Sequence, residues 1–163
     1  MPEIEYERVS SAPTEAIVDL YRAGGWWHES PRTRGIIADM IRGSFCFMLA
    51  RTFEGRIVGM ARVISDGVSD AYIQDVVVLP GYRRLGIGRE LIRRLTDFCL
   101  EREIEWIGLV SEPGTQKFYQ NLGFRELEGY RAMIYSKDAG TESGLPAPAR
   151  AGKSRVLKPS SSE

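Results

Sequence analysis

The spacing of hydrophobic residues changes several times along the chain, and each change marks a predicted element. Alternation of apolar and polar residues predicts strands, whereas apolar residues three or four positions apart predict helices. The predicted strands are residues 4–9, 45–51, 56–64, 72–79, 106–110 and 132–135. The predicted helices are residues 13–21, 30–41, 87–99 and 113–121. Strands and helices interleaved in this order predict an α/β (mixed α+β) fold, with a central sheet covered by helices.

Composition changes sharply near the C-terminus. From Asp138 onward there are no aromatic residues, and small residues and proline dominate. Such a segment cannot bury enough apolar surface to offset the entropy of ordering it. Because a domain typically needs about 100 to 200 residues, the chain of 163 residues has room for one. We therefore predict one domain over residues 1–137 and a disordered tail over residues 138–163.

Charge and hydropathy exclude several classes of function. Lys+Arg and Asp+Glu both number 22, so no global field favours a nucleic acid or an anionic membrane as partner. The apolar runs are far shorter than the roughly 18 residues of a membrane span, and the acidic N-terminus does not resemble a signal peptide, which predicts the cytoplasm. Cys46 and Cys99 lack further ligands at metal-binding spacing, so we predict buried thiols and no metal site.

Three arginines crowd the start of the helix predicted over residues 87–99. Arg83, Arg84 and Arg89 stand at the end of the helix dipole that is positive and that normally favours acidic residues. Gly86 and Gly88 leave nearby backbone N–H groups accessible, so a phosphate can approach several of them. This combination predicts a site for a pyrophosphate.

The alternatives for this segment are weaker. Arg93 and Arg94 lie four residues from acidic partners and are interpreted as part of a solvated helix face. The segment has no Gly-Lys-Ser/Thr of a Walker loop, and Leu91 stands where a dinucleotide fingerprint needs a third glycine.

Two segments resemble motifs of one enzyme family. Arg83-Arg84-Leu85-Gly86-Ile87-Gly88 resembles the Arg/Gln-x-x-Gly-x-Gly/Ala signature of the GCN5-related N-acetyltransferase (GNAT) family, which cradles the pyrophosphate of acetyl-CoA. The segment from Phe118 to Phe124 resembles the later Phe-Tyr-x-x-x-Gly-Phe element of that family. The resemblance covers residues 4–136 in element order. It implies a mostly antiparallel, twisted sheet of about six to seven strands and acetyl-CoA as co-substrate, without a metal.

The resemblance also implies how the co-substrate binds. The strand before the signature separates from its neighbour in the family, so Val76, Val77 and Val78 are expected to offer main-chain groups to the pantetheine arm. A backbone N–H there can stabilise the oxyanion of the acyl-transfer intermediate. The remaining residues expected to bind the co-substrate are Arg83, Arg84, Leu85, Gly86, Ile87, Gly88, Arg89, Thr115 and Phe118.

Two further residues are candidates for the chemistry itself. The resemblance places Tyr119 as the general acid that protonates the departing thiolate of CoA. Asp75 lies inside an apolar strand, where a carboxylate is unfavourable unless it is paired or functional. We therefore hold two interpretations of Asp75: a base or amine anchor, acting directly or through water, or a carboxylate bonded to neighbouring structure. The strand resembles that of glucosamine-phosphate N-acetyltransferases, but Gln74 stands where they carry Glu.

The acceptor site is the least specified part of the prediction. Trp27 and His28 follow the first predicted helix, in the region where the family builds its acceptor pocket, and an aromatic wall attracts an amine cation. Ordinary packing is the alternative for both residues. The predicted function is direct acetyl transfer to a primary amine of a small molecule, and neither nucleic acid nor a membrane is a predicted partner. A non-catalytic acyl-CoA-binding regulatory module and a protein N-acetyltransferase are the alternatives, and the family also allows a homodimer.

Overall fold

One sheet forms the centre of the computed structural model, which describes residues 2–135. Its strands are β1 (Ile4–Arg8), β2 (Cys46–Thr52), β3 (Ile57–Ser65), β4 (Asp70–Val78) and β5 (Trp106–Leu109). They lie in sequence order across the sheet. The pairings from β1 to β4 are antiparallel, and β4 pairs with β5 in parallel. A parallel last pair requires a crossover between β4 and β5, and a helix supplies it.

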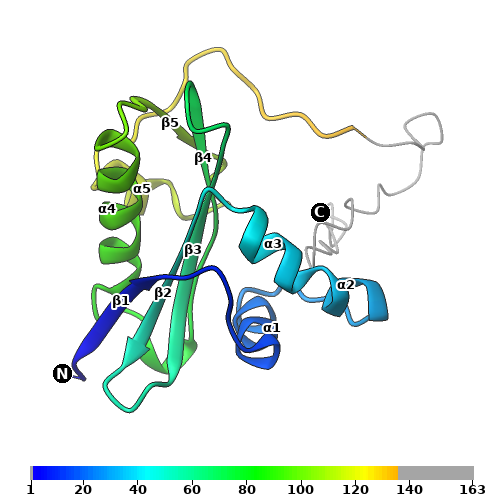
Figure 1. Cartoon of the computed structure of the whole chain (residues 1–163). Coiled ribbons are helices and arrows are strands. Elements are labelled where there is room, and N and C mark those ends of the chain that lie inside the picture. Colours follow the sequence, from blue (N-terminus) through cyan, green and yellow to red (C-terminus); the bar gives the residue numbers. More distant parts are fainter. Residues whose placement is uncertain (1, 136–163) are drawn as a thin grey trace, which may run out of the picture.

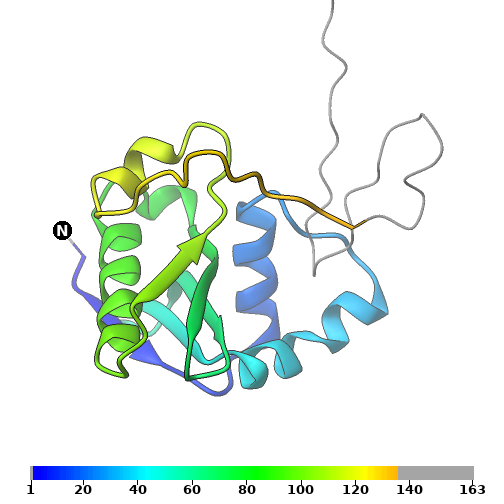
Figure 2. The same cartoon turned by 90° about the horizontal axis from the view of Figure 1, so that it is seen from above.

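Helices cover both faces of the sheet. They are α1 (Thr14–Ala23), α2 (Pro31–Gly35), α3 (Ile37–Gly43), α4 (Ile87–Leu100) and α5 (Gln116–Gln120), with a short 3-10 turn over Pro80–Tyr82. Figures 1 and 2 show α4 along one face and α1 to α3 on the opposite face. α4 is the crossover helix, and the chain reaches its N-terminus from the C-terminal end of β4 through the 3-10 turn and residues 83–86.

The core is divided by the sheet into two layers. Alternating residues of β2 illustrate the division, because successive side chains of a strand point to opposite faces. Cys46 and Met48 join the cluster beneath α4, whereas Phe47 and Leu49 join the cluster beneath α1. The two longest helices, α1 and α4, each supply an apolar stripe to their layer, and residues Ile17, Leu20 and Tyr21 of α1 are almost completely buried.

Most predicted elements are confirmed with small shifts of their ends, but two are not. The helix predicted over residues 30–41 is divided at Ile36 into α2 and α3, next to Gly35, a residue type that weakens helices. Its predicted start is confirmed, since Ser30 is the N-cap directly before Pro31 and forms a capping box with Thr33.

The last predicted strand is wrong. Residues 131–135, the last that the structure describes, form no strand, and Met133 is 92% exposed. The described sheet therefore has five strands rather than six or seven. A short apolar run such as residues 132–135 favours a strand, but only pairing with a neighbour makes one, and the sequence does not contain that information. The tail predicted over residues 138–163 lies outside the described residues.

Candidate active site

β4 extends beyond the end of its neighbour β5. The two strands pair from Asp70 opposite Trp106 to Ile73 opposite Leu109, where β5 ends. β4 continues to Val78 and stays paired with β3 on its other side. Residues 74–78 therefore have a side that β5 does not cover, which we call the open edge. The sequence resemblance implied this separation of strands, and the structure places it directly before the arginine-rich turn.

A bulge inside β4 decides which backbone groups face the open edge. The bulge is centred on Asp75, whose φ of 54° is left-handed. Beyond it, Val77 lies opposite Met60, and the N–H of Leu79 donates to the carbonyl of Val58 on β3 at 2.8 Å. Backbone groups of alternate residues point to opposite sides of a strand. Val76 and Val78 therefore direct their main-chain groups to the open edge, whereas Val77 directs its own toward β3.

The turn over residues 83–89 exposes the N-terminus of α4. Arg84 and Gly86 have φ values of 62° and 82°, so two left-handed residues turn the chain sharply into the helix. Gly86 is the N-cap, and no described side chain caps it. The first backbone N–H groups of a helix lack partners within the helix, so they are available to an anion. A Cβ added at Gly88 would lie 3.6 Å from the ring of Phe118 and 3.8 Å from Val78. The turn, β4 and α5 thus meet at Gly88.

The arginines of this turn differ in what they contact. Arg83 donates from Nε to the carbonyl of Val78 and from Nη2 to the carbonyl of Ala23, both at 3.0 Å. Arg83 therefore joins the end of β4 to the end of α1. Arg84 and Arg89 are exposed, and within residues 2–135 neither forms an ion pair. Leu85 and Ile87 complete the turn, with Ile87 buried under it.

Tyr119 lies on α5, next to the same turn. Its ring contacts those of Phe118 and Phe124, with centroids 5.0 and 6.0 Å away, and packs against the core beneath α4. Burial, and secondly the charge of Glu112, raise the pKa of the Tyr119 hydroxyl above its usual 10. The hydroxyl is therefore protonated at neutral pH and can donate a hydrogen bond. Thr115 precedes α5, and its hydroxyl donates to the carbonyl of Glu112 at 2.7 Å.

Glu112 also contacts the loop after α1, a connection that the sequence analysis did not foresee. The indole Nε1 of Trp26 donates to Oε1 of Glu112 at 2.7 Å. A Cβ at Gly24 would lie only 2.8 Å from the ring of Trp26, so glycine is required for this ring position. Trp26 and Glu112 are 86 residues apart, and no local pattern announces their contact. The signals present were a tryptophan after two glycines and a carboxylate seven residues before Tyr119.

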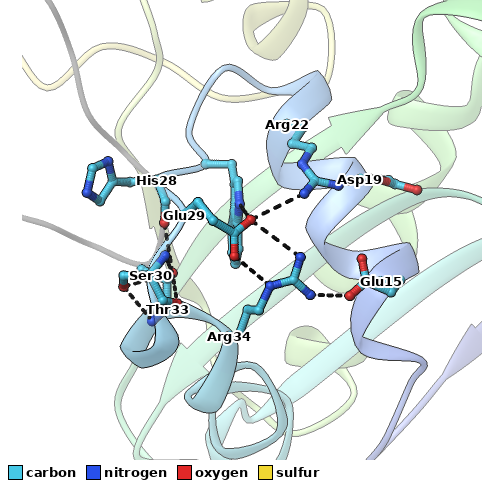
Figure 3. Close-up of polar contacts among 9 residues, drawn as sticks. Glu15, Asp19, Arg22, His28, Glu29, Ser30, Thr33 and Arg34 are labelled. Carbon is cyan, nitrogen blue, oxygen red and sulfur yellow. Dashed lines mark hydrogen bonds and ion pairs between the residues drawn. The ribbon is translucent and has the colours of Figure 1, made fainter.

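Trp27 and His28, the predicted acceptor residues, lie in that same loop but have different surroundings. The Nε1 of Trp27 donates to Oε2 of Glu29 at 2.9 Å, and its ring packs near Tyr21. His28 is exposed, and Figure 3 shows its imidazole pointing away from the neighbouring polar contacts. The carbonyl of His28 accepts the hydroxyl of Thr33 at 2.7 Å.

A network of exposed charges holds this loop against α1 and α2 (Figure 3). Glu29 accepts hydrogen bonds from Arg34 at 2.5 Å and from Arg22 at 3.3 Å, and Arg34 also pairs with Glu15. The hydrogen bond from Arg34, followed by that from Trp27, lowers the pKa of Glu29 to about 2. Side-chain contacts therefore hold the loop after α1 at both of its ends, through Trp26 at one end and Glu29 at the other.

Asp75 is 7% exposed, and its side-chain partners include Tyr21 and Arg62. Its Oδ2 accepts the hydroxyl of Tyr21 at 2.8 Å and Nε of Arg62 at 2.6 Å. These contacts support the interpretation of Asp75 as a carboxylate bonded to neighbouring structure. An incoming amine would have to displace one of the two donors to reach this oxygen.

Within residues 2–135, no group of His, Cys, Asp and Glu side chains is placed to hold a metal. Cys46 and Cys99 are free and buried, and burial raises the pKa of Cys46 to about 11. Within the same residues, every helix falls short of the length and apolar character of a membrane span. A hollow of about 280 Å³ between α1 and the β2–β3 hairpin, lined in part by Ala16 and Arg56, contains none of the candidate site residues.

Comparisons with known proteins agree with this geometry. A family model described as Acetyltransferase (GNAT) family matches residues 14–124. A protein of Glycine max named Histone acetyltransferase TAP1 is 42% identical over 83 residues, which are 50% of this chain and 36% of that protein. A protein of Oryza sativa subsp. japonica named Serotonin N-acetyltransferase 2, chloroplastic, is 40% identical over 87 residues, 53% of this chain and 44% of that protein.

The matched part thus spans less than half the length of these two relatives. Among solved structures, an acetyltransferase of the GNAT family from Streptococcus pneumoniae is 26% identical, with a TM-score of 0.70. That match covers 83% of this chain and 99% of the other.

Proposed function

Because the chain belongs to the acetyltransferase (GNAT) family, we propose that it transfers an acetyl group from acetyl-CoA directly to the nitrogen of a primary amine. The observation that carries this proposal is the position of the open edge of β4 directly beside the uncapped N-terminus of α4. One surface for a diphosphate and one for an extended amide-containing arm meet at Gly88.

The residues of the 83–89 turn fit a diphosphate. Gly86 at φ 82° has open space where a Cβ would stand, so the backbone there can be approached closely. The helix dipole and the first N–H groups of α4 attract an anion, and Arg84 and Arg89 add positive charge without carboxylate partners in the described chain. Arg83 contributes by fixing the end of β4, because its guanidinium is used by two carbonyls.

The main-chain groups of Val76 and the N–H of Val78 would pair with the pantetheine arm along the open edge, whereas the carbonyl of Val78 accepts a hydrogen bond from Arg83. A backbone N–H on this edge would also stabilise the oxyanion that forms when the amine attacks the thioester carbonyl. The co-substrate supplies an activated acyl group, and the new C–N bond replaces the C–S bond. Neither described cysteine is exposed, so the proposal includes no acyl-enzyme.

Tyr119 would assist the departure of sulfur. A tyrosine with a raised pKa is a weaker acid than a thiol, whose pKa is about 8.5. Its hydroxyl therefore acts by donating a hydrogen bond to sulfur while negative charge develops there. The one proton that the attacking nitrogen loses balances the one that sulfur gains, so the products are an amide and the free thiol of CoA, and Tyr119 ends in its protonated form. In this role Tyr119 is needed in its protonated form, and the raised pKa preserves that form across the neutral and mildly alkaline range.

The acceptor side is proposed to lie between the loop after α1 and the loop after β5. The charge of Glu112 raises the pKa of Tyr119, and its carboxylate accepts a hydrogen bond from Trp26. A carboxylate and an aromatic ring therefore lie together on this side. Such a pair attracts an ammonium group. Trp27 and His28 follow in the same loop and remain proposed pocket residues.

The proposed acceptor is a small molecule, as for the rice relative, whose name refers to serotonin. Transfer to a protein amine is the second candidate, because the name of the soybean relative refers to histones. We propose the cytoplasm as compartment, with a plastid as the alternative suggested by the word chloroplastic in the rice name. A homodimer stays a proposal that sedimentation of the full chain would test.

Release of free thiol from acetyl-CoA tests the proposed reaction. With a panel of alkylamines, arylalkylamines and lysine-containing peptides, at least one acceptor should give turnover. Tyr119→Phe should lower kcat about 100-fold, because it removes a donor that acts in the transition state. Tyr130→Phe is the matched control, since Tyr130 is 79% exposed and lies outside the site. Binding of CoA without turnover on any acceptor would instead favour a regulatory acyl-CoA-binding module.

A further inference from the structure

A buried ion pair lies directly behind the open edge of β4. Arg62 and Asp75 approach to 2.6 Å, and their side chains are only 14% and 6% exposed. Tyr21, which is 1% exposed, donates its hydroxyl to the same carboxylate oxygen at 2.8 Å. Buried charges are stable only when they are paired and hydrogen-bonded. We call Tyr21, Arg62 and Asp75 the Asp75 cluster.

The Asp75 cluster coincides with the bulge in β4. Met60 lies opposite Val77 and Arg62 lies opposite Gln74, so two residues of β4, Asp75 and Val76, face the single residue between Met60 and Arg62 on β3. Asp75 adopts a left-handed backbone conformation within the bulge, with φ of 54°. Asp and Asn tolerate this conformation better than other residues that carry a side chain. Nη2 of Arg62 also donates to Oε1 of Gln74 at 3.3 Å, so Arg62 contacts Asp75 of the bulge and the residue before it.

After the bulge, each side chain of β4 points to the opposite face of the sheet from the one that regular alternation would give it. Ile73 belongs to the core layer beneath α4, whereas Val77, four positions later, belongs to the layer beneath α1. In a regular strand, two residues four positions apart would face the same side. Val76 and Val78 consequently pack toward α4 and present their main-chain groups to the open edge. Without the extra residue, the alternation would shift by one position, and Val77 would take their place.

We propose that Tyr21 and Arg62 are positioning residues that hold Asp75 and thereby keep the main-chain groups of Val76 and Val78 directed at the co-substrate. This inference rests on the proposed acetyl transfer along the open edge. Neither side chain touches the reacting atoms. Tyr21 and Arg62 act from α1 and β3 on the backbone of β4, and Tyr21 also contacts Met40 of α3 with its hydroxyl, at 3.0 Å from sulfur. The cluster therefore connects the sheet to the helices that carry the acceptor-side loop.

The role predicts a specific effect on ligand affinity. Two ligands separate binding of the diphosphate from binding of the pantetheine arm. They are CoA, and adenosine 3′-phosphate 5′-diphosphate, which keeps the diphosphate but lacks the arm. Tyr21→Phe removes one hydroxyl and no ring. This variant should leave the Kd of the shorter ligand within about twofold of the wild-type value and raise the Kd for CoA about 10-fold. It should also lower kcat about 10-fold to 100-fold, since misplaced main-chain groups lose transition-state contacts. Tyr6→Phe on β1 is the control and should change none of these values.

Substitution of Arg62 tests the same proposal independently. Arg62→Met should give the same loss of CoA affinity relative to the shorter ligand, and Arg62→Lys should restore part of it, because an ammonium group still reaches the carboxylate. Circular dichroism and thermal unfolding identify variants that fold. Should Arg62→Met fail to fold, Tyr21→Phe carries the test alone. An unchanged ratio of the two Kd values in folded Tyr21→Phe would overturn the proposal, whereas a wild-type chain that binds neither ligand would instead refute the proposed function.

The pH dependence of Asp75→Asn separates positioning from general base catalysis. Asparagine tolerates the left-handed conformation of this position, so the bulge can still form, but the ion pair with Arg62 is lost and the bulge is held less firmly. For a positioning residue, kcat/KM falls but its pH profile keeps the shape seen in the wild-type chain. Loss of the acidic limb of that profile in Asp75→Asn would show that Asp75 takes the amine proton, and would overturn the positioning role.

Discussion

Two groups of arginines on the same helical segment have opposite surroundings. Arg93 and Arg94, in the second turn of α4, contact Glu90 and Asp97 at 2.5 to 2.9 Å. Glu90 has its pKa lowered to about 2, with the hydrogen bond from Arg93 as the largest cause. The arginines of the 83–89 turn have no carboxylate partner within residues 2–135, although the positive end of the helix dipole opposes them.

The difference separates charge that stabilises a helix surface from charge that we propose to bind an anion. Pairs at i,i+3 and i,i+4 neutralise Arg93 and Arg94 within the helix itself. The arginines of the 83–89 turn add positive charge where the helix already has it, beside N–H groups that no described side chain caps. A bound anion would make the arrangement at the turn favourable, and the two groups should respond differently to substitution.

Insertion of a side chain into the turn should have the largest effect. Gly86→Val places a β-branched residue at φ 82°, where L-residues are strained, and covers the N–H groups of α4. We expect CoA binding, measured by calorimetry, to weaken more than about 100-fold. Gly55→Val is the matched control, because Gly55 has φ 83° and equally open surroundings in the β2–β3 turn. It should lose similar thermal stability and keep CoA affinity. Equal loss of affinity in both variants would contradict the account.

Removal of the unpaired arginines should have an intermediate effect. Arg84→Ala and Arg89→Ala should each raise the Kd for CoA about 10-fold, because each loses a charge-assisted contact to phosphate. The affinity of the wild-type chain should fall with added salt, and the fall should be shallower in the double variant. Titrations at two salt concentrations provide the measurement. Identical salt slopes for the wild-type chain and the double variant would place the diphosphate elsewhere.

Arg93→Ala should have the smallest effect. CoA affinity should stay unchanged, and the midpoint of thermal unfolding should shift by about 1 to 2 °C at neutral pH, as for other exposed pairs. The pKa of Glu90 is depressed in the folded chain, so its contribution is present above pH 4.5 and is lost as the pH falls toward about 2. The difference between the wild-type chain and Arg93→Ala should therefore vanish in acid. A loss of CoA affinity in Arg93→Ala would remove the distinction between the two groups.

The sequence specified those parts of the fold that depend on local spacing. The helix beginning after Gly86, the β2–β3 hairpin and the start of α2 at Pro31 follow from caps, turn residues and periodicity, and the structure confirms them. The strand predicted over residues 132–135 is wrong because a strand requires a neighbour, and the pattern does not show whether one is in reach.

A candidate site could be proposed from the sequence where a short motif contains the chemistry, as at the 83–89 turn, and its role there stays a proposal. Contacts between distant residues could not be predicted. The hydrogen bond between Trp26 and Glu112 joins two loops, and the pairing of Asp75 with Arg62 depends on a bulge that shifts the register by one residue. Both require the sheet to be assembled first. For Asp75, the sequence indicated only that a carboxylate inside an apolar strand must have a partner or a function, and it did not identify the partner.

Amide chemical shifts recorded during a CoA titration test the central claim most directly. With the chain labelled in ¹⁵N, the account predicts that the largest changes occur at Gly86, Ile87 and Gly88, and at Val76 and Val78 on the open edge of β4. Tyr6 on β1 and Gly55 in the hairpin turn should show little change. Saturable shifts confined to other residues, or no shifts at millimolar CoA, would contradict the claim that the 83–89 turn binds the diphosphate of the co-substrate.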